Sequence, residues 1–154
     1  MKSKLSDCET NDPLDVAQEY LNKFGMEYLT KTVSPLLPNY SPDTKFYAEL
    51  LNCRPKYLIT TNWGNMLQNA IETGLYMYDI IADDTELMDS KLFNEYIKMH
   101  EDFQHKFILT KGSYNSYSKN YSLIENFVNS ILCTNTVLFI GYSLSDKDFE
   151  HVLD

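Results

Sequence analysis

The sequence predicts a single α/β domain in which a mainly parallel sheet is flanked by helices. Three observations lead to this fold class. Short β-rich runs alternate along the chain with segments of helical periodicity, an order typical of βαβ units. Residues 136–140 form an apolar run, as expected of a strand buried on both faces of a parallel sheet. Residues 121–132 place their apolar side chains on one helical stripe. A length of 154 residues suits one domain.

The first third of the chain is predicted to contain two helices joined by a loop. Asp12-Pro13 is typical of a helix start, because proline is favoured at the first helical position. Apolar residues at helical spacing continue this helix to about Lys31. Residues 34–42 contain three prolines and an asparagine and predict a loop. A second, short helix is predicted through Phe46 and Leu51.

The rest of the chain is predicted to alternate between strands and helices. Helices are predicted at 65–73, where Gly74 acts as the stop, and at 121–132. The acidic residues 83–90 predict a solvated loop or one helical turn. Strands are predicted at residues 57–60, 77–81, 95–99, 106–110 and 136–140. The strands at 77 and 106 are short enough to pair at an edge, so a mixed sheet is also possible.

The C-terminal residues are predicted to turn and begin another helix. Residues 141–144 predict a turn, and Ser145 with Asp148 three positions later resembles a capping box. The polar residues 1–11 are expected to be disordered and carry no apolar signal segment. The domain is therefore expected to occupy residues 12–154.

Composition disfavours several classes of partner. With 22 acidic and 13 basic residues the net charge is −9, so phosphate backbones would be repelled. No basic run suits an anionic membrane surface, and no apolar run approaches the ~20 residues of a membrane span. Cys8, Cys53 and Cys133 are dispersed, which favours reduced cytoplasmic thiols and gives no zinc site. His100 and His105 indicate a metal site only weakly.

Three polar clusters follow predicted strands. They are Thr60-Thr61-Asn62, His100-Glu101-Asp102, and Gly141-Tyr142-Ser143 with Asp146. In open α/β sheets, ligands bind beyond the carboxyl ends of the strands. Three such clusters on one rim predict a pocket.

Each residue in these clusters also has a purely structural interpretation. Asn62 can orient a ligand hydroxyl or a water, or it can cap the helix that begins near Gly64. His100 can act as a general base or be an ordinary histidine at a strand end. Gly141 permits close backbone approach or a tight turn. Ser143 and Asp146 suit ribose hydroxyls as well as turns and caps.

Several runs together resemble the sirtuin-like NAD-consuming domains of bacterial anti-phage defence. Tyr57-Leu-Ile-Thr-Thr-Asn-Trp-Gly64 resembles their T-T-N-aromatic-D motif, and Ile97-Lys-Met-His-Glu-Asp-Phe103 resembles their K-hydrophobic-H-G-D motif. Phe107-Ile-Leu-Thr110 with Tyr114 resembles the following strand. Val137-Leu-Phe-Ile-Gly-Tyr-Ser-Leu-Ser-Asp146 resembles their late F-I-G-[FY]-S-x-x-D signature. Each motif alone is weak, but the set occurs in order and covers the chain from about Asp15.

The resemblance implies a Rossmann-like sheet and cleavage of the nicotinamide–ribose bond of NAD, the substrate, without a metal. It implies that Asn62 and His100 are the catalytic pair. Binding of the nucleotide would fall to Thr60, Thr61, Trp63, Asp102, Gly141, Tyr142, Ser143 and Asp146. A protein deacylase is disfavoured, because those enzymes carry a four-cysteine zinc module.

The sequence departs from the family pattern in four respects. It contains no Gly-Ala-Gly phosphate loop, so the first βα unit is missing and the domain is expected to be partial. Gly64 replaces an aspartate, Glu101 replaces a glycine, and the chain stops at Asp154 shortly after the last motif. These departures predict that the chain alone hydrolyses NAD poorly. Two alternatives remain: a complementing chain supplies the missing unit, or the chain is a non-catalytic interaction module. A homo-oligomer is also possible.

Overall fold

Three parallel strands form the central sheet. The computed structural model describes residues 1–5, 9–36, 44–91, 93–99 and 108–142. Within these ranges the strands are β1 (Tyr57–Thr60), β2 (Asp79–Ile81) and β3 (Glu95–Lys98), in the order β1-β3-β2. Both pairings are parallel, so the described sheet is not mixed. The strands predicted at 57–60, 77–81 and 95–99 are confirmed, the last two with shorter bounds.

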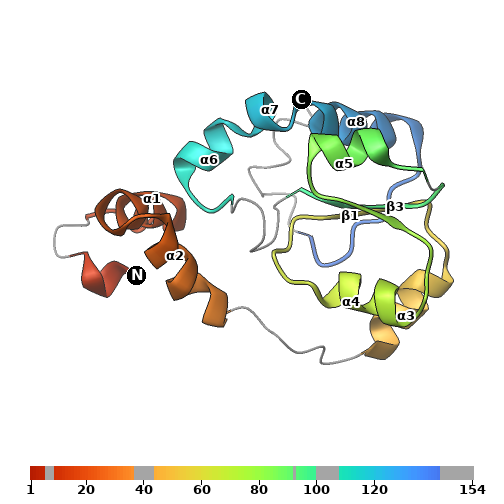
Figure 1. Ribbon diagram of the computed structural model, residues 1–154, viewed down its shortest axis with the longest axis horizontal. Coiled ribbons are helices and arrows are strands. Elements are labelled where there is room, and N and C mark those ends of the chain that lie inside the picture. The colour runs from red at the N-terminus through yellow and green to blue at the C-terminus, as the bar shows by residue number, and fades with distance from the viewer. Residues whose placement is uncertain (6–8, 37–43, 92, 100–107, 143–154) are drawn as a thin grey trace.

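Helices cover both faces of the sheet, which confirms the predicted fold class (Figure 1). Helices α3 (Thr44–Asn52) and α4 (Met66–Thr73) lie on one face, and α5 (Asp84–Asp89) and α8 (Ser122–Thr134) lie on the other. Strand alternation explains the two layers, because successive side chains point to opposite faces. Leu58 and Tyr96 pack with α3 and α4. Ile81 and Ile97 pack with the buried stripe of α8.

A pair of helices lies beyond one end of the sheet. The helix predicted to run from Pro13 to about Lys31 is instead two helices, α1 (Pro13–Phe24) and α2 (Met26–Val33). Gly25 separates them with a φ of 82°, a conformation that cannot continue a right-handed helix. The break lets α2 fold back on α1, and the hydroxyls of Tyr20 and Thr32 lie 3.0 Å apart. Short 3₁₀ turns, η1 (Lys2–Lys4) and η2 (Ser34–Leu36), flank the pair, and Leu5 is buried against it.

The strand predicted at 106–110 is wrong over its described residues, 108–110, which are not in the sheet. Thr110 instead begins helix α6 (Lys111–Asn115): its hydroxyl accepts from Ser113 N–H while the Ser113 hydroxyl accepts from Thr110 N–H. This reciprocal cap overrides the β propensity of the preceding residues. Leu109 packs against the α1–α2 pair. A further short helix, α7 (Tyr117–Asn120), leads into α8.

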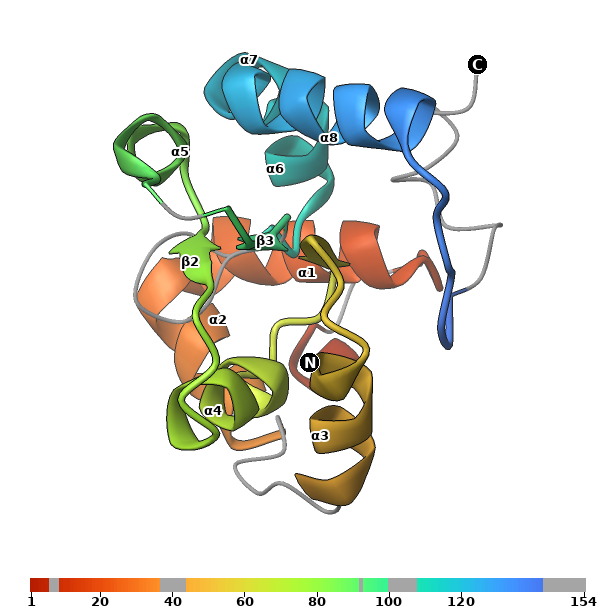
Figure 2. The same ribbon diagram turned by 90° about the vertical axis from the view of Figure 1, so that its right-hand side faces the viewer.

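The strand predicted at 136–140 is also wrong. These residues are exposed and belong to no strand, and Leu138 is 80% exposed. Figure 2 shows why: the chain leaving α8 runs on the far side of β1 from β3, separate from the sheet. An apolar run becomes a buried strand only when a neighbouring strand and a covering layer are present. In the described part of the chain, nothing pairs with the outer edge of β1.

Candidate functional site

The carboxyl ends of β1 and β3 form one edge of the sheet, called here the carboxyl edge. Thr60 and Lys98, the last residues of the two strands, are register partners. Met99 N–H then donates to the carbonyl of Thr60 over 2.9 Å. The chain leaves β1 toward α4 through residues 61–65, called here the Asn62 loop. This edge faces the α1–α2 pair (Figure 1).

Asn62 is exposed at this edge. Its backbone N–H donates to the hydroxyl of Thr60 over 3.1 Å, which bends the chain sharply as it leaves the strand. The interpretation of Asn62 as a helix cap is wrong, because α4 begins at Met66 and Asn65 is the residue at its N-cap. The carboxamide of Asn62 therefore has no role in capping that helix.

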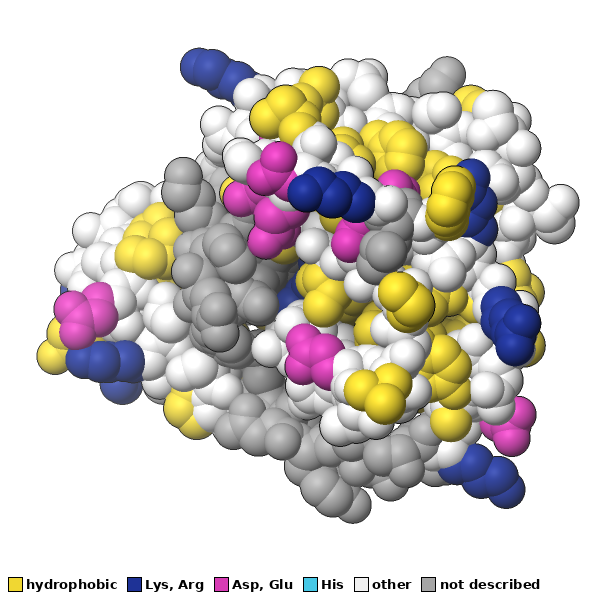
Figure 3. Space-filling view, turned by 45° about the vertical axis from the view of Figure 1, so that its right-hand side comes forward, with side chains coloured by type: hydrophobic (Ala, Val, Ile, Leu, Met, Phe, Trp, Pro, Cys, Tyr) yellow, Lys and Arg dark blue, Asp and Glu magenta, His cyan; other side chains and the backbone are white. Residues whose placement is uncertain are grey.

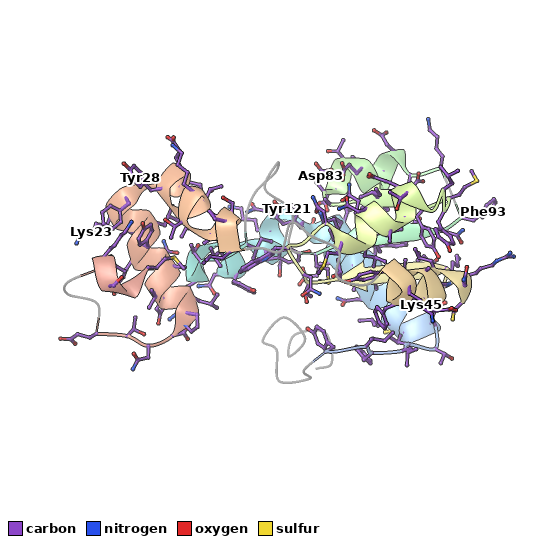
Figure 4. The ribbon with its side chains drawn as sticks, turned by 90° about the horizontal axis from the view of Figure 1, so that it is seen from below. Lys23, Tyr28, Lys45, Asp83, Phe93 and Tyr121 are labelled. Atoms are coloured by element: carbon purple, nitrogen blue, oxygen red, sulfur yellow. The ribbon has the colours of Figure 1, made fainter. Side chains whose placement is uncertain are left out.

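Trp63 joins the Asn62 loop to the helical pair. Its ring is partly buried against the hydrophobic cluster of α1 and α2. Thr60 and Thr61 are half-buried beside it. The predicted ligand residues at the end of β1 thus lie between the sheet and the helical pair. Figure 4 places Lys23 and Tyr28 of that pair on one side of the molecule and Phe93, just before β3, at the opposite end.

Two of the remaining predicted site residues are described, and neither follows a strand of the sheet. Gly141 (φ 62°) and Tyr142 follow the exposed apolar run instead of a strand end. The Tyr142 ring contacts the Phe139 ring, with centroids 6.0 Å apart. The other predicted positions lie outside the described residues; they are His100, Asp102, Ser143 and Asp146.

Comparison with known proteins settles the family. Residues 56–154, well over half of the chain, match the SIR2-like domain family. The chain belongs to this family. It is 26% identical over 157 aligned residues to defense-associated sirtuin 2 of Bacillus subtilis, an alignment that covers 98% of this chain and 16% of that protein.

Two further relatives are named NAD(+) hydrolase ThsA. The protein of Cytobacillus dafuensis is 27% identical over 92% of this chain and 30% of its own length. That of Acinetobacter baumannii is 25% identical over 96% of this chain and 31% of its own length. The chain therefore spans less than a third of each of these relatives. The resemblance inferred from the sequence motifs is confirmed.

Gly64, which stands where the resemblance predicts an aspartate, is not required there for steric reasons. Among the described residues, a Cβ added at Gly64 would meet only the terminal methyl of Met66, at 4.0 Å, and Gly64 has no positive φ. The described residues therefore leave room for the Cβ of the aspartate that the resemblance leads one to expect. Loss of that carboxylate is a chemical change at the Asn62 loop, not a steric requirement of the fold.

Sequence reasoning missed a buried polar contact in the SIR2-like domain. Lys98 is only 1% exposed, and its ammonium donates to Asn65 Oδ1 over 2.7 Å and more weakly to Gln68 Oε1 over 3.4 Å. The sequence signals are a lysine that follows two apolar residues at the end of β3 and its place in the motif Ile97-Lys-Met-His-Glu-Asp-Phe103. The partners of Lys98 are about 30 positions away in sequence, so nothing local reveals them.

The clearest carboxyl pKa shift at the sheet lies at the opposite, amino edge. Burial raises the pKa of the Glu95 carboxyl, while its hydrogen bond from Ser90 and the charge of Lys56 act to lower that pKa. Glu95 is the first residue of β3 and therefore lies far from Asn62. We assign it to the fold rather than to the site.

Among the residues that the structure describes, no three His, Cys, Asp or Glu side chains are grouped as metal ligands. No described helix has the length and apolar character needed to cross a bilayer.

Proposed function

We propose that this chain is the part of an NAD-hydrolysing SIR2-like domain that holds the nicotinamide ribose, and that it acts in anti-phage defence. The observation that carries the proposal is the position of Asn62, which is exposed at the carboxyl edge on a loop held by the hydroxyl of Thr60. Relatives of the chain are named NAD(+) hydrolase and defense-associated sirtuin. Ligands of open α/β sheets bind at this edge.

The reaction that fits these residues is hydrolysis at C1′ of the nicotinamide ribose. The C1′–N bond breaks and its electron pair goes to the pyridine nitrogen, so that nicotinamide leaves as a neutral molecule. Water attacks C1′, and its proton passes to a base. In this proposal Asn62 orients the ribose or the water through its amide, and His100 is the base.

Binding of the rest of NAD is proposed for the residues around this pair. Thr60, Thr61 and Trp63 surround Asn62 in the chain, and Asp102 follows His100. Gly141, Tyr142, Ser143 and Asp146 would hold the adenosine side. No metal takes part in this scheme. We also propose a cytoplasmic location, because Cys53 and Cys133 are free, exposed thiols of the kind that persist in reducing compartments.

We propose that NAD turnover by the chain alone is slow. The five glycines are isolated from one another, so no glycine-rich loop is present to hold the pyrophosphate. A displacement of about 1 Å at the reacting centre can cost on the order of a hundredfold in rate. Such a loop would come from polypeptide outside these residues, for example a complementing chain, on a strand added beside β1. The outer edge of β1, which no described strand pairs with, and the exposed run at 137–140 support this idea.

The charge of the chain disfavours nucleic acid as a partner. On the face in Figure 3, lysine and arginine side chains lie apart from one another and form no stripe. The net charge of −9 acts in the same direction.

The test is release of nicotinamide from NAD by the wild-type chain, by Asn62→Ala and by His100→Ala. We expect slow release by wild type, and at least a tenfold further loss in each variant. Affinity for NAD is measured in parallel by calorimetry. Binding without turnover would support the interaction-module alternative, and neither binding nor turnover would overturn the proposal for this chain.

A further inference from the structure

The Asn62 loop is held at both of its ends by side chains from the sheet. At the start of the loop, the hydroxyl of Thr60 accepts from the backbone N–H of Asn62. At its end, the carboxamide oxygen of Asn65 accepts from the ammonium of Lys98 over 2.7 Å. Between these two contacts lie only Thr61 to Gly64, and they include the residue proposed to bind ribose.

The side chain of Asn65 has an unusual hydrogen-bond partner for a residue at a helix N-cap. An asparagine at an N-cap normally accepts from the free N–H groups of its own helix. Asn65 makes no such side-chain cap bond to α4. Its oxygen is directed to Lys98 of β3 instead, so a contact that would stabilise the helix locally is used to join the loop to another strand.

A lysine is energetically unfavourable at this buried position unless hydrogen bonds compensate its ammonium. Lys98 is 1% exposed, at the last position of β3 and on the same face of the sheet as Tyr96. Burial of an ammonium is costly and is tolerated only with hydrogen-bonding partners. An apolar residue would fill the same place at no such cost. A buried lysine at this position therefore favours a role other than core packing.

We infer that Lys98 is a positioning residue: through Asn65 it fixes the conformation of the Asn62 loop, and so the placement of the Asn62 carboxamide. Lys98 need not touch the substrate to do this. The inference rests on the proposed function only for its consequence for NAD, and the fixing of the loop is testable without any ligand.

The chain contains its own reporter for this test. Trp63 is the only tryptophan, it lies inside the Asn62 loop, and its ring is partly buried against α1 and α2. Tryptophan fluorescence therefore reports the order of this loop and its packing against α1 and α2. A loosened loop exposes the indole to water, which moves emission to longer wavelength and makes quenching by acrylamide more efficient.

Four variants separate the contact from general effects on folding. Lys98→Met keeps the unbranched stem but removes the donor, and Asn65→Ala removes the acceptor. Asn65→Asp keeps an oxygen acceptor opposite the ammonium and should restore the contact. Tyr78→Phe is the matched control, because it removes a tertiary hydrogen bond, from Tyr78 Oη to the carbonyl of Pro55 over 2.6 Å, away from the loop.

We expect red-shifted emission and at least twofold stronger quenching in Lys98→Met and in Asn65→Ala. The double variant should change no more than the larger single change, because each single variant already breaks the contact between Lys98 and Asn65. Asn65→Asp and Tyr78→Phe should resemble wild type. Far-UV circular dichroism checks that each variant is folded. Should Lys98→Met fail to fold, the half-buried Asn65 provides the deciding variant.

Wild-type fluorescence in folded Lys98→Met and Asn65→Ala would overturn the inference. Titration with NAD supplies the second readout. If wild type binds NAD, Asn65→Ala should weaken that affinity about tenfold and Asn65→Asp should recover most of it; an unchanged affinity would remove the link between the loop and the substrate. If wild type does not bind NAD, the proposed function fails, and the fluorescence alone decides whether Lys98 holds the loop.

Discussion

At the scale of single residues, two glycines differ in how much space surrounds them. A Cβ at Gly64 meets nothing closer than 4.0 Å, whereas a Cβ at Gly74 would lie 2.4 Å from the Tyr76 ring and 2.9 Å from the carbonyl oxygen of Ala70. We therefore expect Gly64→Asp to change the free energy of unfolding by less than about 0.5 kcal/mol. Gly74→Ala should cost about 1–3 kcal/mol, because Tyr76 must move and would lose its bond to Asn52. Urea unfolding measures both. Equal losses in the two variants would show that the Asn62 loop has no spare room.

At the scale of elements, the start of α8 is capped by a neighbouring helix. Tyr121 at the N-cap of α8 makes no side-chain cap, and the Asp84 carboxylate of α5 accepts from Ile124 N–H at 3.0 Å and Leu123 N–H at 3.2 Å. Asp84→Ala should lower the free energy of unfolding by about 1–2 kcal/mol. Asp84→Asn keeps one acceptor oxygen and should lose less than half of that amount. Thermal unfolding followed by circular dichroism compares the two, and equal losses would indicate that charge rather than hydrogen bonding holds the helix end.

At the scale of the whole molecule, a run of exposed apolar residues at 137–140 lies beyond the edge of β1 that no described strand pairs with. Leu138 is 80% exposed beyond the open edge of β1, and Phe93 is 89% exposed at the amino edge. We expect Leu138→Asp to reduce self-association or capture of a complementing chain at least fivefold, because a charge opposes strand addition at an open edge. Phe93→Asp should leave association unchanged. Sedimentation velocity distinguishes these outcomes, and equal effects of the two substitutions would point to non-specific apolar contact.

The sequence predicted those parts of the fold that local pattern determines. The strands at 57–60 and 95–98 are β-rich runs bounded by turns, and the stripe of α8 has helical spacing. The run at 137–140 carries an equally strong strand pattern, but pairing depends on a neighbour that no local pattern reports. The same limit applies to the candidate site. Asn62 could be predicted from its motif, whereas the contact between Lys98 and Asn65 forms only because β3 lies beside β1.

The contact between α1 and α6 joins segments that are translated at different times. Gln18 Oε1 accepts from the backbone N–H of Gly112, 94 positions later in the chain, and Lys111 pairs with Asp15 over 3.1 Å. A ribosome adds about 5–20 residues per second, so roughly 5–20 seconds separate translation of α1 from that of its partner. During that interval the apolar face of the nascent α1–α2 hairpin lacks Leu109. The apolar face of the first helices to be translated therefore stays incompletely covered until a segment from the last third of the chain has been synthesised.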